Sequence, residues 1–163
     1  MILRPRIELY GLTLAPFPEL DSCQYLFLDE LCEQGLNSLR VVVREARTRR
    51  KPVPINVAGQ SLGEAYPVKS DSGCSIYEIT SPKYVTYQVR NESYAVADAS
   101  DEISTGRLMK LYSASHFLEY VQRQTCAGPE FPGPLLHFCL ICSDHIIDVV
   151  SDQKPSVRTM CIS

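Results

Sequence analysis

Tryptophan, internal repeats and long hydrophobic runs are all missing from the 163-residue sequence. The longest uncharged run that is rich in apolar residues, Phe131 to Ser143, contains two prolines and a histidine and is too short to cross about 30 Å of hydrocarbon. Arg4 and Arg6 resemble the basic start of a signal peptide, but Glu8 interrupts the apolar stretch around them. The sequence therefore predicts neither a membrane span nor a secretion signal, and we expect a cytoplasmic protein.

A phosphate-binding motif is lacking as well, because no glycine-rich loop ends in GK[ST]. Ser113, Ser115 and His116 have the residue types of a hydrolase site, but a hydroxyl at a helix start is also explained by capping of free backbone N–H groups. Asp144 and His145 are an acid/base pair in one interpretation and a solvated turn in the other.

Cysteine is present in an odd number, seven, mostly within apolar segments, which favours buried free thiols over a disulfide framework. His137, Cys139, Cys142 and His145 have the spacing H-x-C-x2-C-x2-H, and all four side chains are potential zinc ligands. If residues 135–142 form a strand, its side chains alternate, so Cys142 points away from His137 and Cys139. We therefore predict no metal and no cofactor, with both cysteines packed as small hydrophobic residues.

The composition, 45% hydrophobic and 21% charged, is that of a soluble globular protein. A chain of this length buries roughly 70% of the surface that it exposes when unfolded, so it needs no metal or disulfide to fold. Prolines and glycines recur between residues 48 and 73, which predicts a loop-rich segment with one short strand at 53–57. We treat residues 1–163 as a single domain.

The first half of the chain contains short elements separated by turn signals. Residues 6–14 are typical of a strand. A helix is predicted between Asp21, a suitable N-cap, and Gly35, a suitable stop. Its apolar residues recur at helical spacing: Tyr25, Leu28, Leu31 and Cys32. Segment 37–47 fits both a strand and a helical stripe, and its three consecutive valines favour the strand.

From Cys74 onward the strand signals become stronger. In segment 84–90, Val85, Tyr87 and Val89 alternate with polar residues, so we predict that these three side chains face the core. Further strands are predicted over 75–80, 94–98, 107–112, 135–142 and 145–151, with hairpin turns at 91–92 and 143–144.

A second helix is predicted after residue 115, where Ser113 or Ser115 is the cap and Phe117, Leu118 and Val121 form the apolar side. Together these elements predict an α+β domain. Its architecture would be a curved, mainly antiparallel β-sheet with two helices packed against it.

Charge is distributed unevenly along the chain. Between residues 40 and 51, six basic side chains accompany one acidic side chain, so this segment carries +5 and the rest of the chain −8. No aromatic residue interleaves the basic segment and the surrounding field is negative, so we do not expect nucleic-acid binding. Acidic side chains gather on one side of the first predicted helix and in a later loop, either as ordinary solvated faces or as a binding surface.

Four stretches, 87–94, 112–118, 132–137 and 145–151, resemble a group of small bacterial proteins of unassigned activity, of the kind found as immunity partners of secreted toxins. The resemblance covers roughly residues 74 to 155. None of its motifs is specific to a reaction, so it implies no catalytic residues. It implies a protein that binds and neutralises a toxin.

Two functional hypotheses follow from the sequence. The first is a non-enzymatic protein-binding module, a cytoplasmic immunity protein that steers a cationic toxin onto its acidic residues. Those residues are Asp29, Glu30, Glu33, Asp98, Asp101 and Glu102. The second is a small enzyme or ligand-binding domain. Its polar groups would be Arg90, Tyr112, His116 and His145. The sequence leaves the oligomeric state open.

Overall fold

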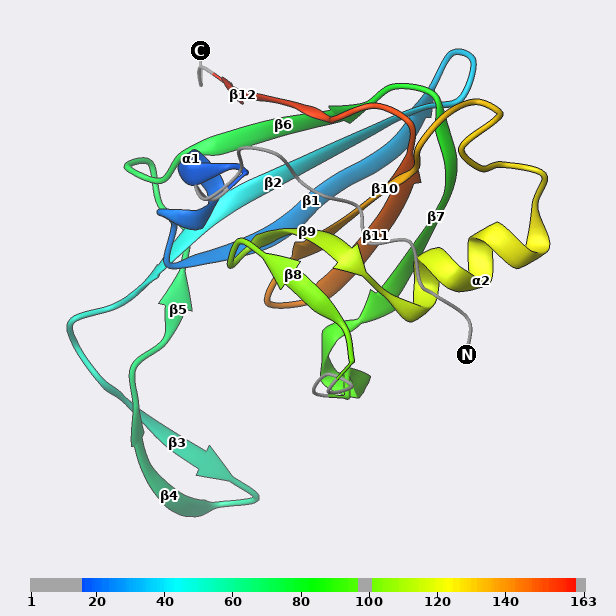
Figure 1. The fold of residues 1–163 in the computed structure, drawn as a ribbon. Helices are drawn as coiled ribbons and strands as arrows, with labels where there is room; N and C mark the ends of the chain where they lie inside the picture. The colour runs from blue at the N-terminus through cyan, green and yellow to red at the C-terminus, as the bar shows by residue number, and fades with distance from the viewer. Residues whose placement is uncertain (1–15, 97–100, 161–163) are drawn as a thin grey trace.

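A computed structural model describes residues 16–96 and 101–160. These residues form an α+β fold that consists mainly of antiparallel strands with two helices (Figure 1). The predicted fold class is confirmed at this level. The strands are arranged differently from the single predicted sheet, because they form two five-stranded sheets and a separate two-stranded hairpin. The strand predicted at 6–14 lies outside the described residues.

The first sheet has the order β1-β2-β6-β12, and β5 pairs with the end of β2. Its strands are β1 (Tyr25–Gln34), β2 (Ser38–Thr48), β5 (Val68–Lys69), β6 (Ile76–Ser81) and β12 (Ser156–Met160). Segment 37–47 therefore forms a strand as predicted. Between β1 and β2 the backbone turns through Gly35 and Asn37, which have φ angles of +59° and +55°.

The first predicted helix is wrong, because residues 25–34 form strand β1. A β-bulge between Leu28 and Glu30 explains the error. The bulge adds a residue to one strand of the pair, so that Leu28 and Leu31, three residues apart, both pack against the same core. This spacing imitates the period of a helix.

The second sheet has the order β7-β11-β10-β9-β8. Its strands are β7 (Tyr84–Asn91), β8 (Ile103–Thr105), β9 (Met109–Ala114), β10 (Leu136–Ile141) and β11 (His145–Ser151). The predicted strands at 107–112, 135–142 and 145–151 correspond to β9, β10 and β11. The strand predicted at 94–98 is wrong in its described part, where a 3-10 helix, η1 (Glu92–Tyr94), follows β7 and no strand forms over residues 94–96.

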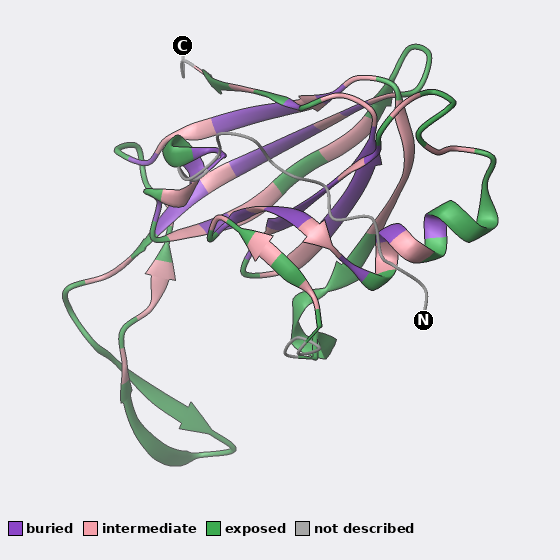
Figure 2. Ribbon diagram, in the orientation of Figure 1, coloured by how far each residue is buried: buried purple, intermediate pink, exposed green. Residues whose placement is uncertain are grey.

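The main hydrophobic core lies between the two sheets. Its members from the first sheet include Leu26, Leu39, Val43 and Ile79, and those from the second include Phe138, Leu140, Ile147 and Val149. Figure 2 shows the buried residues following the strands of both sheets. The chain passes between the sheets twice, from β6 to β7 and from β11 to β12, so the two sheets share one core.

The two helices are α1 (Pro18–Asp21) and α2 (His116–Gln124). Ser115 is the N-cap of α2, as one of the two predicted alternatives, and its Oγ accepts a hydrogen bond from the Leu118 N–H at 3.0 Å. Leu118 and Val121 are buried in a smaller cluster with Leu135 and Val150. No helix in the described part of the chain is long and apolar enough to cross a membrane.

The hairpin of β3 (Val53–Val57) and β4 (Gln60–Ala65) projects from the rest of the molecule (Figure 1). The short strand predicted at 53–57 is thus confirmed, but the segment 48–73 is less loop-rich than predicted, because it also contains β4 and β5. Its turn residues Ala58 and Gly59 both have positive φ angles, +50° and +81°, as expected for a two-residue hairpin loop. Almost the whole hairpin is exposed (Figure 2).

The predicted core side of β7 is correct in part. Tyr87 packs against the main core and Val85 against the smaller cluster, but Val89 is 43% exposed. The prediction for Val89 is wrong, because β7 is an edge strand of the second sheet and its last three residues are exposed. Its neighbour across the sheet, Ile147, is only 1% exposed.

A Val89→Asp substitution should therefore lower the free energy of unfolding by less than about 1 kcal/mol, because the new carboxylate stays solvated. Ile147→Asp on the adjacent strand should cost several kcal/mol, because it buries an unpaired charge. Urea unfolding of both variants measures the difference. Equal losses in the two variants would contradict the placement of Val89 outside the core.

Candidate functional site

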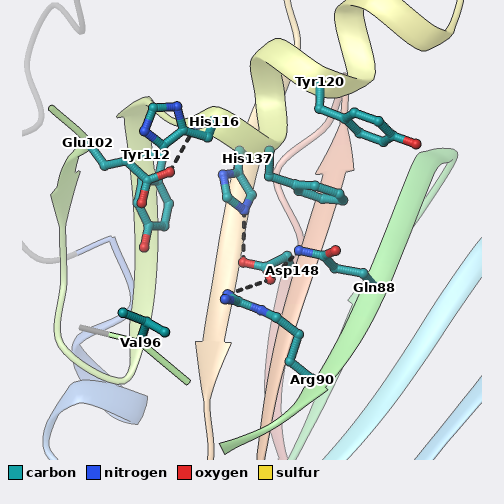
Figure 3. Close-up of a pocket in the computed structure, with 10 residues that line it drawn as sticks. Gln88, Arg90, Val96, Glu102, Tyr112, His116, Tyr120, His137 and Asp148 are labelled. Atoms are coloured by element: carbon teal, nitrogen blue, oxygen red, sulfur yellow. Dashed lines mark hydrogen bonds and ion pairs between the residues drawn. The ribbon is translucent and has the colours of Figure 1, made fainter. Parts of the chain in front are cut away.

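A cleft of about 600 Å³ opens between α2 and the second sheet (Figure 3). Side chains from β7, β9, β10, β11 and α2 line it, together with two residues outside these elements, Val96 and Glu102. They are Gln88, Arg90, Val96, Glu102, Tyr112, His116, Phe117, Tyr120, His137 and Asp148. Of the ligand-site residues predicted from sequence, the structure brings Arg90, Tyr112 and His116 together here. His145 does not line this cleft.

A chain of hydrogen bonds crosses the floor of the cleft from helix to sheet. Ser115 Oγ lies 2.7 Å from His137 Nδ1, and His137 Nε2 lies 3.1 Å from Asp148 Oδ1. The Ser115 oxygen already accepts the Leu118 N–H, and a carboxylate can only accept. The pattern therefore assigns the imidazole proton to Nε2 and makes Nδ1 the acceptor of the Ser115 hydroxyl.

Asp148 is the centre of this network and is almost fully buried. Its Oδ2 accepts hydrogen bonds from Gln88 Nε2 and Arg90 Nη2, each at 2.9 Å. Burial alone would raise the pKa of this carboxyl. The hydrogen bonds from His137 and Gln88, with the charge of Arg90, outweigh burial and lower the pKa to about 2. Asp148 is therefore a carboxylate at neutral pH, and it holds Arg90 and Gln88 in place.

Aromatic rings form much of the cleft wall. The imidazole of His137 stacks on Tyr112 with a centroid distance of 4.5 Å and an interplanar angle of 12°. Phe117 contacts the same imidazole edge to face at 5.4 Å. Tyr120, one helical turn after His116, extends over the opposite side of the cleft (Figure 3).

A second hollow of about 150 Å³ continues the cleft and shares Arg90, Val96 and Tyr112 with it. This hollow is also lined by Lys110 and Cys139. Burial first, and then the charge of Asp148, raises the pKa of the Cys139 thiol, which keeps the thiol protonated. The continuous floor thus carries two cationic side chains and one buried carboxylate.

Ser115, His137 and Asp148 have the residue types of a hydrolytic triad, but not its geometry. In a working triad the histidine accepts the serine proton at Nε2 and its Nδ1–H faces the aspartate, and this order is reversed here. Ser115 is also buried and its oxygen caps α2. The capping interpretation of Ser115 is therefore confirmed, and the arrangement is structural.

The predicted acidic residues of the first half lie on strand β1, not on a helix. All three are exposed, and each contacts a side chain of another strand, β2 for Asp29 and Glu30 and β7 of the second sheet for Glu33. Asp29 pairs with Arg44 at 2.8 Å, Glu30 pairs with Arg40 at 2.6 Å, and Glu33 accepts a hydrogen bond from the Tyr87 hydroxyl at 3.1 Å. The basic segment of the sequence is thus partly neutralised within the fold.

The acidic loop of the second half lies at the start of α2. Asp101 Oδ1 is 3.0 Å from His116 Nε2, and Glu102 Oε1 accepts the His116 backbone N–H at 2.8 Å. Carboxylates are favourable at this end of a helix because the backbone N–H groups there are positively polarised. Asp98 lies outside the described residues.

The histidine and cysteine spacing near the C-terminus does not converge on one point. Cys142 lies in the main core, where burial raises the pKa of its thiol to about 12, whereas Cys139 faces Asp148. His145 Nδ1 lies 3.2 Å from Asp144, whose other oxygen accepts the Leu28 N–H. Across residues 16–96 and 101–160, no group of three or more His, Cys, Asp or Glu side chains is arranged to hold a metal ion.

Sequence reasoning missed Gln88 and Asp148 as members of the site, and it considered His137 only as a metal ligand. One signal was available. Asp148 interrupts the apolar run of β11, and an acidic residue in a buried strand requires a partner. The alternation of β7 also places Gln88 and Arg90 on one face, so the pairing of β7 with β11 would have completed the site.

Comparisons of the chain with protein-family models, with curated proteins and with solved structures find no match. The function is therefore argued from the geometry of the cleft.

Asp148 should make the stability of the protein dependent on pH in the acid range. Its folded pKa of about 2 lies below the ordinary value of 3.8, so its stabilising contribution is complete above pH 4 and is lost as pH falls toward 2. The contribution amounts to about 2 kcal/mol. Urea unfolding between pH 5 and pH 2 should give a steeper pH dependence for the parent than for Asp148→Asn. Glu64→Gln, on the exposed hairpin, is the control and should follow the parent. The same slope in all three proteins would contradict the assignment.

Proposed function

We propose that the protein is a non-enzymatic binding protein whose cleft receives a small organic anion with a flat apolar body. The observation that carries the proposal is the position of Arg90, which Asp148 holds on the floor of an aromatic-lined cleft (Figure 3). The volume of about 600 Å³ lies in the range of small-molecule sites, roughly 300–1,000 Å³.

The charge of the floor supports an anionic group. Arginine carries five N–H donors in a planar fork, and one of the donors of Arg90 bonds to Asp148. The contact therefore orients the guanidinium and leaves donors that can bind a carboxylate or phosphate oxygen. Because Arg90 is fixed before the ligand arrives, less side-chain entropy is lost on binding. Lys110 adds a second positive charge in the adjoining hollow.

The walls support a flat apolar body. Tyr112, Phe117 and Tyr120 present aromatic surfaces around the floor, and Gln88 adds a planar amide that the Asp148 contact orients. Offset or edge-to-face contacts with a ligand ring contribute about 0.5–1.5 kcal/mol beyond the burial of apolar area. Binding, rather than catalysis, is proposed because the polar groups of the floor are occupied in holding one another.

Benzoate and benzyl alcohol test the proposal as a matched pair of probes, since they share a ring and differ in charge. Benzoate should bind in the cleft at least about tenfold more tightly, a difference of about 1.4 kcal/mol. Isothermal calorimetry gives the affinities, and amide chemical shifts locate the contacts. Equal affinities, or shifts that lie outside the cleft, would refute an anion site.

Two variants separate the roles of charge and ring. Arg90→Gln should abolish the preference for benzoate. Tyr120→Ala should lower the affinity for both probes, because it removes one aromatic wall of the cleft and leaves the contacts of Asp148 unchanged. Arg123→Gln, at the far end of α2, makes the same change of charge as Arg90→Gln and should bind like the parent. If Arg90→Gln keeps the preference, Arg90 is not the anion-binding group.

A second proposal is the immunity-type function, in which the protein binds and neutralises a cationic toxin in the cytoplasm. It is supported by the exposure of Asp29, Glu30 and Glu33 along β1, which is an edge strand of the first sheet. An edge strand also offers unpaired backbone groups to a partner. The internal contacts of these acids with Arg44, Arg40 and Tyr87 reduce, but do not cancel, the charge that a partner would meet.

Replacing the three acids by their amides, Asp29→Asn, Glu30→Gln and Glu33→Gln, should slow association with a cationic partner, most at low salt, while the fold is kept. Binding kinetics with the product of the neighbouring gene measure this effect. Unchanged kinetics would exclude the β1 surface, and absence of binding would exclude the immunity proposal for that partner.

A further inference from the structure

We propose that the projecting hairpin of β3 and β4, called here the arm, docks on a second copy of this chain. The two copies exchange arms about a two-fold axis. The arm of each copy covers an apolar patch on the other, formed by segments 92–96 and 101–103 beside the cleft. This inference does not rest on the ligand or toxin proposals.

The arm has one apolar face. Val53, Ile55 and Val57 alternate along β3 and therefore share a side, and they are 46%, 38% and 55% exposed. Pro54 and Asn56 point to the opposite side, where they are paired with Glu64 and Ser61. An isolated two-stranded hairpin is marginally stable in water, and three or more strands or a packed face are needed for stability. The apolar face thus requires a cover, and residues 16–96 and 101–160 of the same chain do not supply one.

The root of the arm is strongly cationic. Arg49, Arg50, Lys51 and Lys69 line one shallow hollow there together with Val53 and Pro67. Asp71 pairs with Arg49 at 2.8 Å. Segment 49–69 contains four basic residues and one acidic residue, for a net charge of +3, so the rest of the chain carries −6. The surface that receives the arm should therefore be apolar with an acidic border.

The patch at segments 92–96 and 101–103 has these properties. Tyr94, Val96 and Ile103 are exposed. Glu92, Asp101 and Glu102 lie beside them in the chain, and Val96 and Glu102 line the same cleft, which places the two segments together. The patch therefore combines exposed apolar side chains with three carboxylates, complementary to the apolar face and the cationic root of the arm.

We infer that the patch binds the arm of a second copy, because the two complementary surfaces, the arm and the patch, both occur on this chain. The arm projects away from the rest of its own molecule (Figure 1). Its exposed valines show that its own patch does not cover it. Reciprocal docking of two arms on two patches closes the assembly at a dimer with both surfaces filled.

Sedimentation equilibrium of the purified protein tests the inference. The parent should form a dimer whose dissociation constant rises with salt, because the arm root and the patch are oppositely charged. Val53→Ser with Val57→Ser, and separately Val96→Ser, should each weaken the dimer by at least about tenfold, since every change occurs at both interfaces. Leu36→Ser, on the exposed β1–β2 turn, is the matched control and should associate like the parent.

Charge exchange identifies the contact. Arg50→Glu with Lys51→Glu should weaken the dimer, as should Glu92→Lys with Asp101→Lys, and the protein that carries all four changes should recover association. None of these four side chains touches the buried network of Asp148, so the fold should be kept, with a small loss of thermal stability where Asp101→Lys removes the contact with His116 at the start of α2.

A parent protein that remains monomeric up to about 1 mM would overturn the inference and would indicate that the arm binds a different protein. The inference would also be overturned if the arm and patch variants left the dissociation constant of the dimer unchanged. The same holds if the protein with all four charge changes did not recover association. None of these outcomes decides whether benzoate binds in the cleft, which the calorimetric comparison with benzyl alcohol tests separately.

Discussion

The buried carboxylate of Asp148 is the interaction on which the organisation of the site depends. It joins β11 to β10 through His137, to β7 through Gln88 and Arg90, and, through His137 and Ser115, to the N-terminus of α2. A buried charge without partners would cost several kcal/mol, so the surrounding donors and the position of the helix are determined together. The same contacts that make the charge tolerable fix the floor of the cleft, so stability and the geometry of the site have one physical origin.

Elements whose signals are local were predictable from the sequence. Ser115 caps α2 by a contact three residues along the chain, and the β10–β11 hairpin follows from two apolar segments on either side of a short turn. Strand β1 was not predictable from its periodicity, because the bulge at Leu28 is defined by pairing with β2 and gives apolar residues a helical spacing. For the site, Arg90, Tyr112 and His116 were identifiable by residue type. The role of Asp148 depends on strand pairing between residues about sixty positions apart, which no local pattern encodes.

Charge shows the same distinction between composition and arrangement. The basic run in residues 40–51 suggests a cationic surface, yet Arg40 lies between Glu30 and Glu78, and Arg44 and Arg47 are paired with Asp29 and Glu45. Basic and apolar side chains alternate along much of β2, and carboxylates from β1, β6 and β2 itself pair with Arg40, Arg44 and Arg47. Most of the basic run is therefore neutralised by ion pairs. The root of the arm remains cationic. It lies beyond the end of β2, where β1 and β6 no longer pair with the backbone.

The cleft and the patch share Val96 and Glu102, so the two proposed interactions are linked by thermodynamics wherever both occur. A partner's arm seated on Val96 changes the surface that a ligand meets at the rim, and a ligand in the cleft changes the surface that the arm meets. If the two contacts compete for the rim, each weakens the other by the same factor. If the arm completes a wall of the cleft, each strengthens the other equally. The sign of this coupling is decided by whether the ligand's apolar body ends below the rim or reaches Val96, and therefore by ligand length rather than by the anionic group that Arg90 holds.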